Sequence, residues 1–133
     1  MVAARKINTI RTDLGKVGFL ICTELWFGAH DREYAARGIE LLVCPRATGM
    51  TSTDKWIAGG RTAAVVSGAY CLSSNFSHRD GSGLKWGGRG WIIEPEEGQV
   101  LGMTSGDHPF LTLEIDLRTA GAAKKTYPRC VSD

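Results

Sequence analysis

The sequence lacks the features that mark membrane, secreted and nucleic-acid-binding proteins. No apolar run approaches the ~20 residues that a membrane-spanning helix needs. No apolar stretch follows the basic residues near the N-terminus, as it would in a signal peptide. The 16 Lys and Arg residues are nearly balanced by 14 Asp and Glu, and a formal net charge of +2 gives no electrostatic reason to bind a nucleic acid or a membrane surface. We therefore expect a cytoplasmic protein without nucleic-acid or membrane partners.

Metal-binding and redox patterns are also missing. The four cysteines form no Cys-x-x-Cys pair, which argues against a zinc ribbon or a thioredoxin-type motif. The three histidines have no spacing typical of metal ligands. Cys22, Cys44 and Cys71 each lie in or at the end of an apolar run, where a reduced thiol is ordinarily a small packing residue. At most one cysteine is therefore expected to be reactive.

The composition is that of a folded globular chain. Of the 133 residues, 43% are hydrophobic and 23% are charged, which excludes a disordered protein. The length fits a single domain over residues 1–133, or part of a larger one. There are no internal repeats and no low-complexity linker, so we expect one α/β unit.

Strand-like and helix-like segments alternate along the chain. Nearly continuous apolar runs of strand length predict strands covered on both faces. Strands are predicted over residues 7–15 (with a turn), 16–22, 39–45, 69–75, 90–95, 99–103 and 110–116. Helices are predicted over residues 30–37, 55–67 and 117–125, with Thr53 or Asp54 as the cap of the second. The order strand, helix, strand is typical of a βαβ unit.

The segment 18–27, Gly-Phe-Leu-Ile-Cys-Thr-Glu-Leu-Trp-Phe, is the most informative one. A buried strand ends there in Cys22, and polar and aromatic residues follow at once. A nucleophile at such a strand end projects from a sharp turn into a cleft, where backbone N–H groups can stabilise an oxyanion. Packing is the more common role of a strand-end cysteine, so this pattern alone leaves both readings open.

The ordered set of motifs resembles the C-terminal half of the nitrilase, or carbon-nitrogen hydrolase, superfamily. It covers roughly residues 10–127. Its pieces are Gly15-Lys-Val-Gly-Phe-Leu-Ile-Cys-Thr-Glu24, Gly38-Ile-Glu-Leu-Leu-Val-Cys-Pro45, Trp56, Arg61-Thr-Ala-Ala64, Ser74-Asn75, Gly87-Gly88, Trp91-Ile-Ile-Glu-Pro95 and Gly98. The resemblance implies an α/β fold, an αββα sandwich of which this chain would be the incomplete C-terminal half.

The resemblance also implies an activity. Members of this family hydrolyse a nitrile, an amide or a carbamoyl compound through a cysteine nucleophile and a thioester, with a glutamate base, a lysine and no cofactor. Cys22 matches the nucleophile. The glutamate and the lysine belong to the half that is missing, because Lys6 and Lys16 lie too close to Cys22 in sequence to match the lysine. We therefore expect a homo-oligomer or a complementing N-terminal half, and a small-molecule nitrile or amide as substrate.

Five further residues are candidates for supporting the turn or lining a substrate pocket: Glu24, Trp26, Arg46, Ala47 and Asn75. Each also has a simpler reading, as an ordinary loop residue or, for the tryptophan, as a packing anchor. The alternative to an enzyme is a catalytically inactive half-domain that serves in assembly or partner binding. Exposed sheet edges and an uncovered face would favour self-association in either case.

Overall fold

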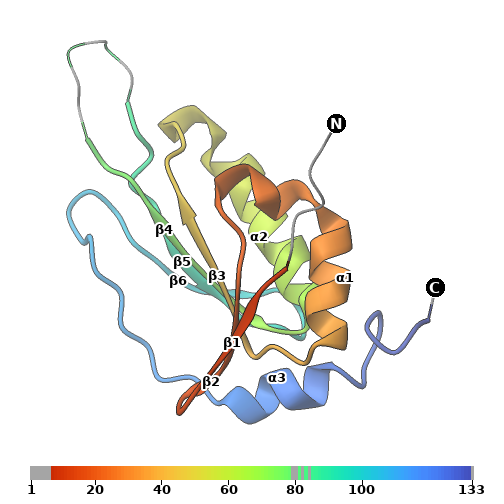
Figure 1. Ribbon diagram of the computed structural model, residues 1–133. Coiled ribbons are helices and arrows are strands. Elements are labelled where there is room, and N and C mark those ends of the chain that lie inside the picture. Colours follow the sequence, from red (N-terminus) through yellow and green to blue (C-terminus); the bar gives the residue numbers. More distant parts are fainter. Residues whose placement is uncertain (1–6, 79–80, 82, 84, 133) are drawn as a thin grey trace.

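The computed structural model describes residues 7–78, 81, 83 and 85–132 and shows one six-stranded mixed sheet with helices (Figure 1). The strands lie in chain order across the sheet: β1 (Thr9–Thr12), β2 (Gly15–Phe19), β3 (Leu41–Arg46), β4 (Tyr70–Asn75), β5 (Trp91–Ile93) and β6 (Val100–Met103). The helices are η1 (Cys22–Trp26), α1 (Gly28–Ala36), η2 (Met50–Ser52), α2 (Thr53–Ser67) and α3 (Leu117–Ala123). The predicted α/β class is confirmed.

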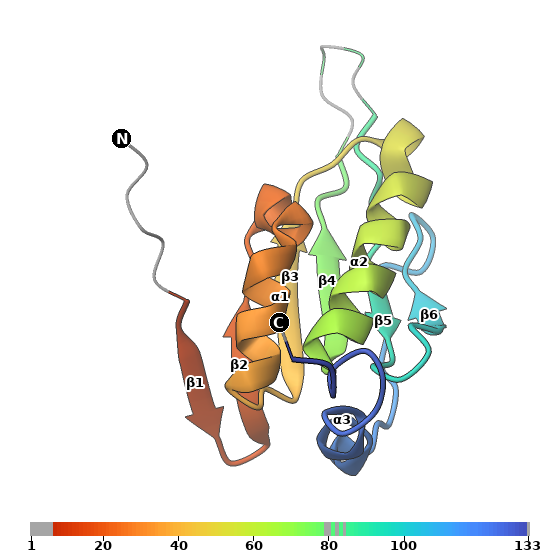
Figure 2. The same cartoon turned by 90° about the vertical axis from the view of Figure 1, so that its right-hand side faces the viewer.

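Strands β2, β3 and β4 form the parallel centre of the sheet, and the other three strands add to it in antiparallel orientation. The crossover from β2 to β3 runs through η1 and α1, and that from β3 to β4 runs through η2 and α2. Both long helices cover the same face of the sheet, as Figure 2 shows. The residues that follow β2, β3 and β4 therefore meet at one edge of the sheet, where ligands of open α/β sheets commonly bind.

The two faces of the sheet differ in how well they are covered. The helix-covered face carries the core, in which Leu42, Cys44, Cys71 and Ile93 are completely buried. The opposite face aligns Phe19, Val43, Leu72 and Ile92 across four strands. Phe19 is 39% exposed, and Ile21 beyond the end of its strand is 55% exposed. This second face is thus apolar and only partly covered by the described residues.

Two sequence-based predictions are wrong. Residues 110–116 form no strand; Leu111 and Leu113 instead come close to Gly102, on the sparsely covered face. Their alternation of apolar and polar residues produces an extended segment, but its backbone pairs with no strand edge. The predicted side-chain cap of α2 is also absent, because the hydroxyl of Thr53 donates instead to the Met50 carbonyl at 2.9 Å.

The third difference concerns the end of β2, which is shorter than predicted. The strand stops at Phe19, and Cys22 already begins η1. The backbone N–H of Leu20 still donates to the Val43 carbonyl at 3.0 Å. The chain therefore leaves the sheet within two residues, which sharpens the turn that carries Cys22.

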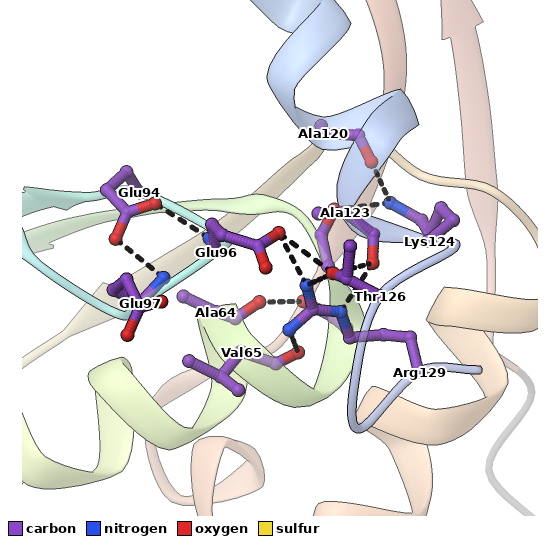
Figure 3. Close-up of polar contacts among 12 residues, drawn as sticks. Ala64, Val65, Glu94, Glu96, Glu97, Ala120, Ala123, Lys124, Thr126 and Arg129 are labelled. Atoms are coloured by element: carbon purple, nitrogen blue, oxygen red, sulfur yellow. Dashed lines mark hydrogen bonds and ion pairs between the residues drawn. The ribbon is translucent and has the colours of Figure 1, made fainter. Parts of the chain in front are cut away.

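The C-terminal segment is fixed to the far end of the sheet, away from Cys22. The Arg129 side chain is 1% exposed and bonds Glu96 at 2.8 Å, the Ala123 carbonyl at 2.6 Å and the Val65 carbonyl at 3.1 Å (Figure 3). Lys124 donates to the carbonyls of three residues, and its burial lowers its pKa to about 8. These contacts tie α3 and the tail to the end of α2. Among the described residues, no helix is long and apolar enough to cross a membrane.

Candidate functional site

Cys22 lies at the carboxyl end of β2 in a strained backbone conformation. Its φ is +49°, and it is the one non-glycine residue in the described part of the chain with a positive φ. Two hydrogen bonds close the turn: the Glu24 N–H donates to the Ile21 carbonyl at 3.1 Å, and the Ile21 N–H donates to Oε2 of Glu24 at 2.8 Å. Strained residues of this kind cluster at functional sites, where the surrounding structure holds them in place.

The strain itself can be measured. We expect Cys22→Gly to be more stable than Cys22→Ala by about 1 kcal/mol, because only glycine adopts a positive φ without steric cost. Both variants lack the thiol, so their difference isolates the backbone. Urea unfolding of the two proteins measures it. Equal stability would show that the turn holds Cys22 without strain.

The four cysteines lie in different surroundings. Cys44 and Cys71 are completely buried, and burial raises the pKa of each thiol to about 12. Cys22 is half-buried and Cys130 is exposed. The Cys44 thiol points at the Cys22 carbonyl, with 4.0 Å between Sγ and O. Two of the four thiols are thus packing groups that stay protonated, which leaves Cys22 and Cys130 accessible to reagents.

Asn75 holds the loop after β3 against the end of β4. Its Oδ1 accepts from the Thr48 N–H at 2.9 Å, and its Nδ2 donates to the Thr48 carbonyl at 3.3 Å. The Gly87 N–H donates to the same carbonyl at 2.7 Å. Asn75 therefore fixes loop geometry at the edge where Cys22 lies. Its role toward a substrate stays a prediction.

The other four candidate residues differ in their exposure and in the groups that they contact. Glu24 closes the turn at Cys22, and Ala47 is exposed on the loop after β3. Trp26 is 43% exposed and packs against Trp56, with 5.3 Å between ring centroids. Arg46 is only 6% exposed, so its side chain belongs to the interior rather than to an open pocket wall.

A pocket of about 430 Å³ lies on the sparsely covered face, next to this edge. Its walls include Leu72, Ile92 and Phe110, together with hydroxyl groups such as that of Ser74. Asn75 also lines it, and so connects the pocket to the loops beyond the strands. In the part of the chain that the structure describes, no group of three or more His, Cys, Asp or Glu side chains could hold a metal ion.

Ser73 was not singled out from the sequence, although it is buried at this edge, as is Thr48. Each is a hydroxyl residue in or just after an apolar strand, and a buried hydroxyl needs a hydrogen-bond partner. That signal marks such residues as parts of a polar network, but it does not identify the partner. Lys16 is one of the two lysines near Cys22 in sequence; it lies near the opposite end of β2 and donates to the Arg37 carbonyl. The other, Lys6, lies outside the described residues.

Comparison with known proteins identifies the family. The family model described as Carbon-nitrogen hydrolase matches residues 2–125. The chloroplastic omega-amidase of Arabidopsis thaliana is 29% identical over 129 residues, which is 96% of this chain and 35% of that protein. Omega-amidase NIT2 of Mus musculus is 29% identical over 122 residues, 91% of this chain and 44% of that protein. The chain thus spans less than half the length of these relatives.

Solved structures agree on the fold. Nit3 of Saccharomyces cerevisiae, described as a member of branch 10 of the nitrilase superfamily, superposes with a TM-score of 0.80 at 21% identity, over 96% of this chain and 47% of that one. The C. elegans NitFhit protein gives a TM-score of 0.83 at 22% identity, over 96% of this chain and 31% of that one. The α/β fold is therefore a partial nitrilase-type domain. With the family match over residues 2–125, the chain belongs to the carbon-nitrogen hydrolase family.

Proposed function

We propose that this chain is the nucleophile-bearing part of a carbon-nitrogen hydrolase and that Cys22 is its nucleophile. The observation that carries the proposal is the position of Cys22, half-buried at a positive φ on the turn that follows a central parallel strand. A nucleophile on a sharp turn at the end of a strand is presented at the carboxyl edge of the sheet. Family membership supports assigning hydrolysis rather than a purely structural role to this geometry.

The reaction follows from thiol chemistry. The Cys22 thiolate attacks the carbon of the carbon-nitrogen bond, the nitrogen leaves as ammonia or an amine after taking up a proton, and water then hydrolyses the thioester. A glutamate base and a lysine would have to come from outside these 133 residues, from a complementing N-terminal half or from an oligomer. A small-molecule amide is the favoured substrate, since two relatives are named omega-amidases, and nitriles and carbamoyl compounds are the other candidates. A cytoplasmic location would keep the thiol reduced.

A second candidate function is assembly without catalysis. It is favoured by the sparsely covered sheet face, on which Phe19 and Ile21 expose 39% and 55% of their surface. Exposed apolar area of this kind promotes association with another protein. Under this reading Cys22 would behave as an ordinary thiol.

Acyl transfer to the Cys22 thiol distinguishes the hydrolase function from the assembly function. We expect limiting p-nitrophenyl acetate, at about pH 7, to acetylate Cys22 faster than Cys130, with release of p-nitrophenol. Cys44 and Cys71 should stay unlabelled until the protein is denatured, because both are buried. Peptide mass spectrometry locates the acetyl group.

Two variants control this experiment. Cys22→Ala should abolish the fast acetylation, whereas Cys130→Ala should leave it intact. If Cys22 reacts no faster than Cys130, the thiol is not activated in this chain, and the assembly function becomes the better account.

A further inference from the structure

Arg46 is a buried cation, and its side-chain hydrogen bonds to the described residues all go to neutral groups. It ends β3 and is 6% exposed. Its Nε donates to Oγ of Ser73 at 2.7 Å, and its Nη1 donates to Oγ1 of Thr48 at 2.8 Å. Its Nη2 donates to the Arg89 carbonyl at 2.6 Å. Among the described residues no carboxylate pairs with it, although a buried charge normally requires an opposite one.

Aromatic rings take the place of a carboxylate around Arg46. The guanidinium carbon lies 3.9 Å from the centre of the Trp91 ring and 5.6 Å from that of Trp56. Ring faces attract a cation, most strongly where water is excluded. This attraction holds the guanidinium in place, but it leaves a full positive charge in the interior.

That charge lies close to the turn at Cys22. Ser73, which accepts from Arg46, donates its own hydroxyl to the Cys44 carbonyl at 2.6 Å. The neighbouring Cys44 thiol in turn points at the Cys22 carbonyl. Burial lowers the pKa of Arg46. These contacts link Arg46 through Ser73 and Cys44 to the backbone of the turn at Cys22.

The three thiols differ in whether they can supply a negative charge. Burial raises the pKa of Cys44 and Cys71 to about 12, so both stay neutral near pH 7 despite the cation beside them. Cys22 is half-buried at the edge of the sheet, on the turn that Glu24 closes. Of the three, Cys22 is therefore the group whose anion can balance the charge of Arg46.

We propose that Arg46 is a positioning residue of the Cys22 site, which fixes the loops at this edge of the sheet and whose uncompensated positive charge favours the Cys22 thiolate. The inference rests on the proposed function of Cys22. It adds a second source of positive charge that this chain supplies itself, independent of any lysine from outside it.

The test is the pH profile of Cys22 alkylation by iodoacetamide, in which the S–C bond forms and iodide leaves. We expect Arg46→Met to move the profile of Cys22 up by about one pH unit, so that the rate on its rising limb falls about tenfold. Arg46→Lys keeps the positive charge, so its Cys22 profile should lie close to that of the unmodified protein. Arg61→Met is the matched control, because the side chain of this arginine on α2 donates to the Gly98 carbonyl and to no other group in the described residues, and its loss should leave the profile unchanged.

A purely structural role gives a different result. If Arg46→Met lowers the melting temperature but leaves the alkylation profile of Cys22 where it was, the proposal is overturned. If acetyl transfer to Cys22 is not fast in the unmodified chain, the proposed function fails instead, and the alkylation profiles of the variants still report on Arg46. The two failures are thus distinguishable.

A second measurement needs no variant and covers the case in which Arg46→Met does not fold. A positive charge beside Cys22 should favour anionic iodoacetate over neutral iodoacetamide. We expect the ratio of the two rates at Cys22 to be several-fold higher in the folded chain than at the same thiol in urea. An equal ratio in both states would overturn the proposal.

Discussion

Asp31→Asn is expected to stabilise the protein by about 2–4 kcal/mol above pH 7 and to abolish a pH dependence of stability between about pH 4 and 7. Asp31 lies on α1 and is 1% exposed, and its Oδ1 has no hydrogen-bond partner in the described part of the chain. Burial raises its pKa from 3.8 to about 7. Above that pH the fold must hold an ionised carboxylate in its interior, which is costly without a partner.

The direction of the pH effect follows from the two pKa values. Between pH 3.8 and about 7 the folded state keeps a proton on Asp31 that the unfolded state has already lost. The free energy of unfolding therefore falls as the pH rises through this window and is level above it. A shift of about three units corresponds to ~4 kcal/mol at most. An asparagine has nearly the same shape and no charge, so the Asp31→Asn protein should not lose stability as the pH rises through this window.

Urea unfolding at several pH values between about 4 and 9 measures this difference. Tyr34 on the same helix and the neutral thiols of Cys44 and Cys71 on the sheet feel the Asp31 charge, and none of these three groups is a cation. Asp116→Asn is the control, because that carboxylate is exposed and Arg118 holds its pKa below the usual range. Its removal should not stabilise the protein above pH 7. An unmodified protein whose stability does not change between pH 4 and 7 would contradict the account of Asp31.

The burial of Asp31 shows what local sequence leaves open. The residues around it predicted a polar helix, and the helix is there, but its polar pattern does not say which face packs inward. The parallel strands and the helices between them were predictable along the chain because they depend on local runs of apolar residues. The surroundings of Arg46 were not, since Trp91 comes from a strand 45 positions later in the chain and reaches Arg46 only once the sheet is assembled.

The segment 110–116 also shows that a local pattern does not determine tertiary contacts. Its alternating pattern is strand-like, yet a strand also needs a neighbouring edge with free backbone groups. The segment instead runs along the sparsely covered face and ends where the Tyr70 hydroxyl donates to the Asp116 carbonyl at 3.2 Å. Periodicity identified the apolar side of this segment but could not decide between pairing with an edge and lying across a face.

Gly60→Ala is expected to destabilise the protein by roughly 2–3 kcal/mol, although alanine is the better helix former by about 1 kcal/mol. A Cβ at Gly60 would lie 2.7 Å from Cζ2 of Trp91 and 2.8 Å from its Cε2. Trp91 cannot move aside easily, because it is 2% exposed and Arg46 stacks on its ring. The glycine pair at 59–60 thus weakens α2 locally but lets a tryptophan pack tightly against the helix.

Two other glycines provide the comparison for this variant. A Cβ at Gly59 would meet Trp26 at 3.0 Å, but that ring is 43% exposed and can shift, so Gly59→Ala should be close to neutral. Gly121 in α3 has nothing within 4 Å, and Gly121→Ala should stabilise by about 0.5–1 kcal/mol. Urea unfolding should therefore rank the variants in the order 121, 59, 60. A Gly60→Ala protein as stable as Gly121→Ala would show that Trp91 is free to move.

The same variant connects stability to the Cys22 site. If Trp91 is displaced, the ring that holds the Arg46 guanidinium moves with it, and the alkylation profile of Cys22 should shift in the direction expected for Arg46→Met. Gly59→Ala disturbs Trp26 but leaves the Trp91 ring in place, so it should not produce this shift. If Gly60→Ala lowers the free energy of unfolding but leaves the alkylation profile of Cys22 unchanged, Trp91 stabilises the core without affecting Cys22 through Arg46.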